Sequence, residues 1–295
     1  MRIGALVDRL EETIGIGGAP RSLLNVIGEI LEAHFDQEAI AAAELAHDVF
    51  DAVARRVMER AQDNENAGTL PTLVILGATS DSIAGYCFIL PNDEPWQIEA
   101  KKQRLNVGPL LEAIRGLGYN EFERFGRQVL TEIGATRTHV TRHGNDQGID
   151  FFGSLSMGQL QQFPPAFAKL AHDVVFSFVG QAKHYPDRTI GPSVVRELIG
   201  SLSLARTKTF SRDDVDIFVG LELKPFSPIL ALLFTTGAIT KGAAKLAESA
   251  GIIARSGEQL AMFLADRRVA MHEVNGAWLF DPVRFAHWIA PPNNE

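Results

Sequence analysis

The sequence feature that most constrains the fold is a pair of short apolar segments that end in polar residues. The first, Gly148–Phe152, carries the carboxylate of Asp150, and the second, Phe178–Lys183, carries Gln181 and Lys183. Both segments are typical of β-strands, and side chains two positions apart on a strand point to the same face of a sheet. The sequence therefore predicts that a carboxylate, an amide and an ammonium group converge from adjacent strands.

These three side chains form a set that can carry out hydrolysis. Carboxylate and amide oxygens are hard ligands suited to Mg²⁺. A lysine ammonium group nearby can orient or activate a water molecule and stabilise the charge that develops on a phosphate. Each residue taken alone also has a structural interpretation, because an Asp at a strand end often caps a turn and a Lys is often a surface charge.

Asp146–Asp150, followed by Gln181–Lys183, resembles the D-G-G-I-D … Q-x-K signature of Mrr-type (type IV) restriction endonucleases. That family belongs to the PD-(D/E)xK nuclease superfamily. The resemblance continues in the family's order through segments that span roughly Gly118 to Leu264, which are Phe122–Phe125, Val194–Gly200, Phe234–Gly237 and Ala243–Ala247. Several blocks in the same order are more specific than one Q-x-K motif.

The resemblance implies an α/β fold, with a restriction-endonuclease-like α/β/α core and a mixed central sheet. It implies that Asp150 is the central metal ligand and that Glu123, on the opening helix, completes the metal shell. Gln181 stands where most of the superfamily has an acidic residue, so it would coordinate only through its carbonyl oxygen. Lys183 would orient the attacking water or stabilise the pentavalent phosphate.

Basic and imidazole side chains near these motifs are candidates for contacts with nucleic acid. His184 directly follows Lys183, and Arg188 lies in the same segment. Together they would form an edge that contacts phosphates, although an ordinary polar loop has the same composition. Arg142, just before the first strand, is a further candidate for a phosphate contact.

The charges divide the chain into two parts. Residues 1–100 contain 6 Lys and Arg against 17 Asp and Glu, a net charge of −11, whereas the remaining 195 residues contain 22 and 19, a net charge of +3. DNA binding depends on local charge, so the mildly basic remainder is compatible with it. The acidic third is expected to oligomerise or to bind a protein partner, and a solvated acidic surface without a partner is an equal alternative.

The order of predicted elements gives three domains. Residues 1–105 predict a mainly helical domain with a helix capped by Ser22, a longer helix over about 37–61, and a small β element with strands over 72–77 and 86–90. Residues 106–268 predict the nuclease domain, in which strands alternate with helices in the second half and so pair in parallel. Residues 269–295 predict a hairpin around Asn275-Gly276 and a short helix.

The predicted function is that of a Mg²⁺-dependent DNA endonuclease, with Mn²⁺ as a substitute, in restriction or anti-phage defence. Cleavage of both strands needs two sites, so a homodimer or larger homo-oligomer is expected. The alternatives are a catalytically silent module that binds nucleic acid or protein, and a nuclease that acts on RNA or repair intermediates. A single cysteine excludes an intramolecular disulfide. Without an apolar run of about 18–20 residues, a cytoplasmic chain with no membrane partner is expected.

Overall fold

The computed structural model describes residues 2–77, 81–141, 148–159, 174–206 and 228–291. The chain forms two compact units, and each is described by itself. The first consists of Met1–Gly108 with Met262–Phe280, and the second of Pro109–Ala261 with Asp281–Glu295. The division into three domains, with boundaries at residues 105 and 268, stays a prediction. None of the described helices is both long enough and apolar enough to cross a bilayer.

The first unit is mainly helical, as the sequence predicts. Its helices α1 (Ile3–Ile14), α2 (Leu23–Phe35) and α3 (Ala39–Ala67) bury leucine, isoleucine, valine and alanine side chains in one core. The hydroxyl of Ser22 accepts a hydrogen bond from the N–H of Asn25 and so caps α2, as predicted. Amphipathic spacing therefore determines this part of the fold.

A small antiparallel sheet completes that core, with strand order β1-β3-β2. Its strands are β1 (Arg21–Ser22), β2 (Leu73–Leu76) and β3 (Ser82–Gly85). The predicted strand over 86–90 is wrong, because β3 lies earlier, where Ile83 and Ala84 are buried. Gly85 ends β3 at a close backbone approach, since a Cβ there would lie 2.3 Å from the carbonyl oxygen of Ile16.

The C-terminal hairpin, β11 (Met271–Val274) and β12 (Ala277–Phe280), belongs to this first unit and is held by α4 (Pro95–Arg104) and the residues after it. The buried amide of Asn106 donates to the carbonyl of Trp278 and accepts from the N–H of Phe280, both at 2.8 Å. The indole of Trp278 donates to Glu99 at 2.6 Å, and this bond holds the pKa of the Glu99 carboxyl below its usual value.

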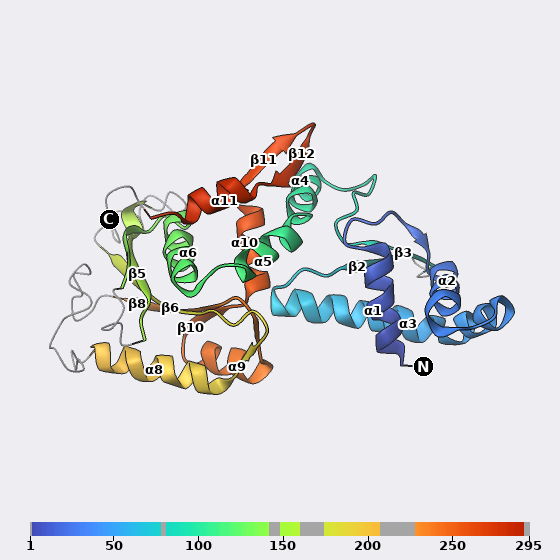
Figure 1. Ribbon diagram of the computed structural model, residues 1–295, viewed down its shortest axis with the longest axis horizontal. Helices are drawn as coiled ribbons and strands as arrows, with labels where there is room; N and C mark the ends of the chain where they lie inside the picture. The colour runs from blue at the N-terminus through green and yellow to red at the C-terminus, as the bar shows by residue number, and fades with distance from the viewer. Residues whose placement is uncertain (1, 78–80, 142–147, 160–173, 207–227, 292–295) are drawn as a thin grey trace. The chain divides into compact units, whose positions relative to one another are not determined.

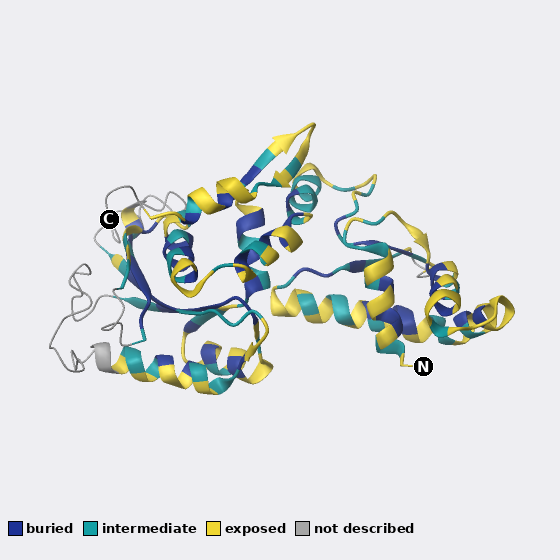
Figure 2. Cartoon of the chain, in the orientation of Figure 1, coloured by how far each residue is buried: buried dark blue, intermediate teal, exposed yellow. Residues whose placement is uncertain are grey.

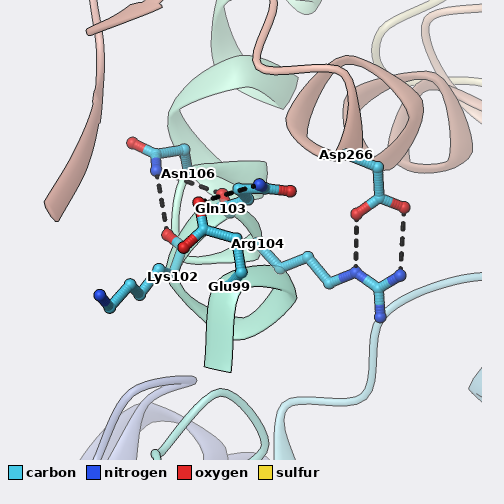
Figure 3. Close-up of polar contacts among 6 residues, drawn as sticks. All are labelled: Glu99, Lys102, Gln103, Arg104, Asn106 and Asp266. Carbon is cyan, nitrogen blue, oxygen red and sulfur yellow. Dashed lines mark hydrogen bonds and ion pairs between the residues drawn. The ribbon is translucent and has the colours of Figure 1, made fainter. Parts of the chain in front are cut away.

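A second contact joins α4 to the end of α10 (Gly257–Asp266). The guanidinium of Arg104 donates two hydrogen bonds to the carboxylate of Asp266, at 2.9 and 3.1 Å (Figure 3). Such a bidentate pair fixes orientation as well as distance. The segment Met262–Phe280 is thus tied to the N-terminal unit by specific polar contacts.

Replacing Asn106 with Ala is expected to destabilise the first unit by about 1–3 kcal/mol, because it removes the side chain that bonds to two partly buried backbone groups of β12. Urea unfolding of the full chain, followed by tryptophan fluorescence, measures this loss. Trp96→Ala is the control, because that side chain is 70% exposed. An Asn106→Ala chain as stable as the control would contradict the assigned role of the amide.

The second unit is built on a five-stranded mixed sheet with the order β10-β8-β6-β5-β4. The strands β4 (Thr136–Val140), β5 (Phe151–Ser156) and β6 (Val175–Lys183) pair antiparallel. The strands β6, β8 (Ile229–Thr235) and β10 (Ile252–Arg255) pair in parallel. The mixed sheet and the parallel pairing in the second half confirm the prediction. Two short strands, β7 (Thr189–Ile190) and β9 (Ala238–Ile239), pair beside it.

Helices cover both faces of this sheet (Figure 1). Helix α6 (Tyr119–Glu132), which follows α5 (Val107–Arg115), packs on β4, β5 and β6. On the other face, α8 (Pro192–Arg206) and α9 (Lys241–Ser249) share a core with β8 and β10. Figure 2 shows the central strands as the buried layer between them. This is the α/β/α arrangement that the sequence predicts.

Phe151 is the centre of the packing between α6 and the sheet. Its ring is fully buried and stacks on Phe234 of β8 with a centroid distance of 5.3 Å. A Cβ atom on Gly126 of α6 would lie 2.4 Å from the ring, and one on Gly180 of β6 would lie 2.1 Å from it. The ring therefore occupies the space that these two glycines leave open.

The last helix, α11 (Pro282–Ile289), belongs to the second unit and packs on α6. Gln128 donates to the carbonyl of Trp288 at 2.6 Å, and the indole of Trp288 donates to Glu132 at 3.0 Å. The segment predicted as one appendage, residues 269–295, is thus shared between the units, with the hairpin in the first and α11 in the second.

Candidate functional site

Three of the predicted site residues lie where β5 and β6 meet. Phe151 pairs with Gly180, and the N–H of Asp150 donates to the carbonyl of Gly180 at 2.9 Å. Because Phe151 and Gly180 face α6, the alternation of side chains along a strand turns Asp150, Gln181 and Lys183 toward the face covered by α8.

The carboxylate of Asp150 is buried against the neighbouring strand. One of its oxygens, Oδ2, accepts a hydrogen bond of 2.6 Å from the N–H of Ala182. The side chain is only 8% exposed. A bond this short to a backbone donor fixes the carboxylate just before the first residue of β5.

Gln181 is 2% exposed, and its carbonyl oxygen Oε1 is buried without a hydrogen-bond partner among the described residues. Its amide nitrogen would lie 3.1 Å from a Cβ on Gly148, and the hydroxyl oxygen of Ser201 on α8 would lie 2.9 Å from the same Cβ. Gly148 also has a φ of +80°, so glycine is needed there for both space and conformation. A buried carbonyl oxygen without a partner is costly unless something binds to it.

The ammonium group of Lys183 lies 3.6 Å from Oε1 of Glu197 on α8. The lysine side chain is 19% exposed and the glutamate 60%. The contact holds the ammonium group on the same side of the sheet as Gln181. It also identifies Glu197 as a neighbour of the site.

The first turn of α6 lies against the end of β6. The imidazole of His184 meets Tyr119 edge to face, with centroids 5.1 Å apart, and lies 6.1 Å from the ring of Phe122. Burial lowers the pKa of His184, which favours the neutral imidazole. Glu123, partly buried, follows Phe122 in the same turn. The structure therefore brings the helix of Glu123 next to the residue after Lys183.

The two arginines predicted to contact nucleic acid, Arg188 and Arg142, are not shown to contact the site. Arg188 is exposed in the loop after β6, and its N–H donates to the carbonyl of Tyr185 at 3.2 Å. Arg142 lies outside the described residues. Among those described, no three His, Cys, Asp or Glu side chains gather closely enough to hold a metal ion.

Three neighbours of the site were not predicted from the sequence as parts of it. Glu197 and Ser201 lie on α8, far along the chain from the strands that they approach. The sequence offers one indication of this, because residues four positions apart lie on the same face of a helix, as Glu197 and Ser201 do on α8. Tyr119 stands four positions before Glu123, so the same spacing was available for it on α6.

Comparisons with known proteins give one family match and one similar solved structure. Residues 114–211 match the model of a restriction endonuclease family, Mrr_cat. A solved structure of the MspJI restriction endonuclease in complex with a 27-mer oligonucleotide is similar over 60% of this chain, with 18% sequence identity and a TM-score of 0.33. The similar region spans 35% of the MspJI chain. No curated protein sequence matches the chain.

Proposed function

We propose that the chain is a DNA endonuclease that hydrolyses phosphodiester bonds with a divalent metal ion, because residues 114–211 match the model of a restriction endonuclease family, Mrr_cat. The observation that carries this proposal is the placement of Asp150, Gln181 and Lys183 on one face where β5 and β6 meet. All three lie inside the segment that matches the family.

The residues present fit a hard divalent cation. Gln181 offers a buried carbonyl oxygen that has no partner among the described residues, and Asp150 offers a carboxylate beside it. From α6, which covers the other face of the sheet, Glu123 would supply a second carboxylate only by reaching past the end of β6. Oxygen donors of this kind suit Mg²⁺, with Mn²⁺ as a substitute. When bound, the ion supplies Lewis acidity toward the phosphate and a more acidic water.

The remaining chemistry belongs to the side chains. Lys183 would donate a hydrogen bond to the attacking water or to a phosphate oxygen, with its ammonium group held by Glu197 until substrate arrives. The short hydrogen bond from the N–H of Ala182 would hold the carboxylate of Asp150 in a fixed orientation for binding the ion. His184, Arg188 and Arg142 would contact the nucleic acid, and their role is proposed from position and charge.

The proposed setting is restriction or anti-phage defence. Two-strand cleavage by such a domain needs two copies of the site, so we expect a homodimer or a larger homo-oligomer. The acidic first unit would serve that assembly or bind a protein partner, since it carries the excess of negative charge in the chain.

Incubation of supercoiled plasmid with the full chain tests the reaction. We expect nicked or linear DNA with Mg²⁺ or Mn²⁺, no cleavage with EDTA, and a loss of at least about 100-fold in Lys183→Ala, because the variant lacks the charge that stabilises the transition state. Lys245→Ala, which removes an exposed lysine of α9, is the matched control. Cleavage that persists in EDTA, or in Lys183→Ala at the level of the control, would overturn the proposal.

A further inference from the structure

Tyr119 is an exposed aromatic residue beside the candidate site. Among the Phe, Tyr and Trp side chains of the described residues, two are exposed: Trp96 at 70%, in the first unit, and Tyr119 at 65%, in the second. Large aromatic rings bury much apolar area when they pack, so leaving one in water forgoes a sizeable gain. Single exposed apolar side chains are common on protein surfaces, so the exposure of Tyr119 matters only through what the ring contacts.

The exposed ring is held in place. Tyr119 is the first residue of α6, and the edge-to-face contact with His184 has an interplanar angle of 85° and a centroid distance of 5.1 Å. His184 is itself partly buried and lies close to Phe122. An aromatic ring fixed in this way loses little conformational entropy when a ligand packs on it.

The ring lies by the end of β6, on the side of the sheet that α6 covers, whereas the side chain of Lys183 points to the side of α8. Tyr119 and Glu123 are separated by four positions on α6, which places them on the same face of the helix. His184, which contacts the ring, directly follows Lys183 at the end of β6. A nucleic acid that crosses the end of β6 to reach Lys183 would therefore pass Tyr119.

We infer that Tyr119 binds the substrate by stacking on a base next to the cleaved phosphate. The inference rests on the proposed nuclease function and specifies how that site recognises its substrate. The face of a base is free only where the base is unpaired, so the contact applies to a single-stranded or opened part of the substrate, and there one exposed ring gives affinity without selecting a sequence. The contact would act on binding and leave the chemical step to Asp150, Gln181 and Lys183.

Binding of a fluorescein-labelled single-stranded DNA oligonucleotide, measured by anisotropy with Ca²⁺ in place of Mg²⁺, tests this contact without cleavage. We expect Tyr119→Ala to weaken binding about 5- to 150-fold, the range measured for one base–aromatic stack. Tyr119→Phe keeps the ring and should bind as tightly as the wild type. Trp96→Ala, which removes the other exposed ring, should also leave affinity unchanged.

Kinetics separate substrate binding from a structural role. If Tyr119 stacks on the substrate, Tyr119→Ala raises KM and retains kcat, whereas displacement of Glu123 would lower kcat and would overturn the inference. Unchanged affinity in Tyr119→Ala overturns it as well, and so does a loss in Tyr119→Phe as large as in the alanine variant, which would point to the hydroxyl group. Binding that depends on Tyr119 in a chain that cuts no DNA would support the contact and refute the nuclease.

Discussion

Replacing Asp150 with Asn is expected to lower plasmid cleavage by at least about 100-fold, which is the scale of losing one charge-stabilising group in a transition state. The substitution preserves shape, and the side-chain oxygen of Asn can still accept the hydrogen bond from the N–H of Ala182. The fold should therefore persist while the negative charge that attracts a cation is lost. Initial rates of nicking in Mg²⁺, compared with the wild type, measure the effect.

Two controls test whether the loss of cleavage in Asp150→Asn comes from the lost carboxylate charge. Thermal unfolding of Asp150→Asn should match the wild type, because the buried donor keeps an acceptor. Glu248→Gln removes one exposed carboxylate of α9 and should cleave at the wild-type rate. If Asp150→Asn were as active as Glu248→Gln, Asp150 would not be the metal ligand, and the proposed site would be wrong.

Phe151→Ala is expected to destabilise the second unit by about 3–5 kcal/mol, the range for removing a large aromatic ring from a core. The effect should lie at the upper end, because the ring fills space beside Gly126 and Gly180, and neither residue has a side chain to close the cavity. Chemical denaturation of the full chain, followed by circular dichroism, gives the change in the free energy of unfolding.

Tyr119→Ala provides the control for this experiment. It removes an aromatic ring from the same unit, but that ring is 65% exposed, so its stability should stay within about 0.5 kcal/mol of the wild type. Equal stabilities for Phe151→Ala and Tyr119→Ala would show that the ring of Phe151 does not support the packing of α6 on the sheet.

The sequence predicts most elements of the second unit because its patterns are local. Short apolar runs locate β6 and β8, and the parallel pairing follows from the helices between strands. The misplacement of β3 in the first unit has a tertiary cause. Ile83 and Ala84 become a strand by pairing with β2, and the carbonyl of Ile16 approaches the backbone at Gly85. No local pattern reports contacts between segments so far apart.

The candidate site also has a part that local sequence motifs indicate and a part that depends on the tertiary structure. Asp150, Gln181 and Lys183 stand in short motifs, so the sequence indicates them and the strand register places them together. The contact between Lys183 and Glu197 depends on how α8 crosses the sheet. The carbonyl oxygen of Gln181 has no hydrogen-bond partner within the described part of the chain, and this depends on burial, which a motif does not encode. Their roles in catalysis remain predictions.

The path of the chain has a consequence for dissecting the protein. Three passages connect the units, after Gly108, after Ala261 and after Phe280. A fragment that begins at Pro109 would still carry the hairpin but would lack Asn106, which bonds to its backbone. A single cut therefore cannot separate the units cleanly. Isolating the second unit requires excising Met262–Phe280 and rejoining the ends, and a protease that nicks one passage would leave the pieces associated.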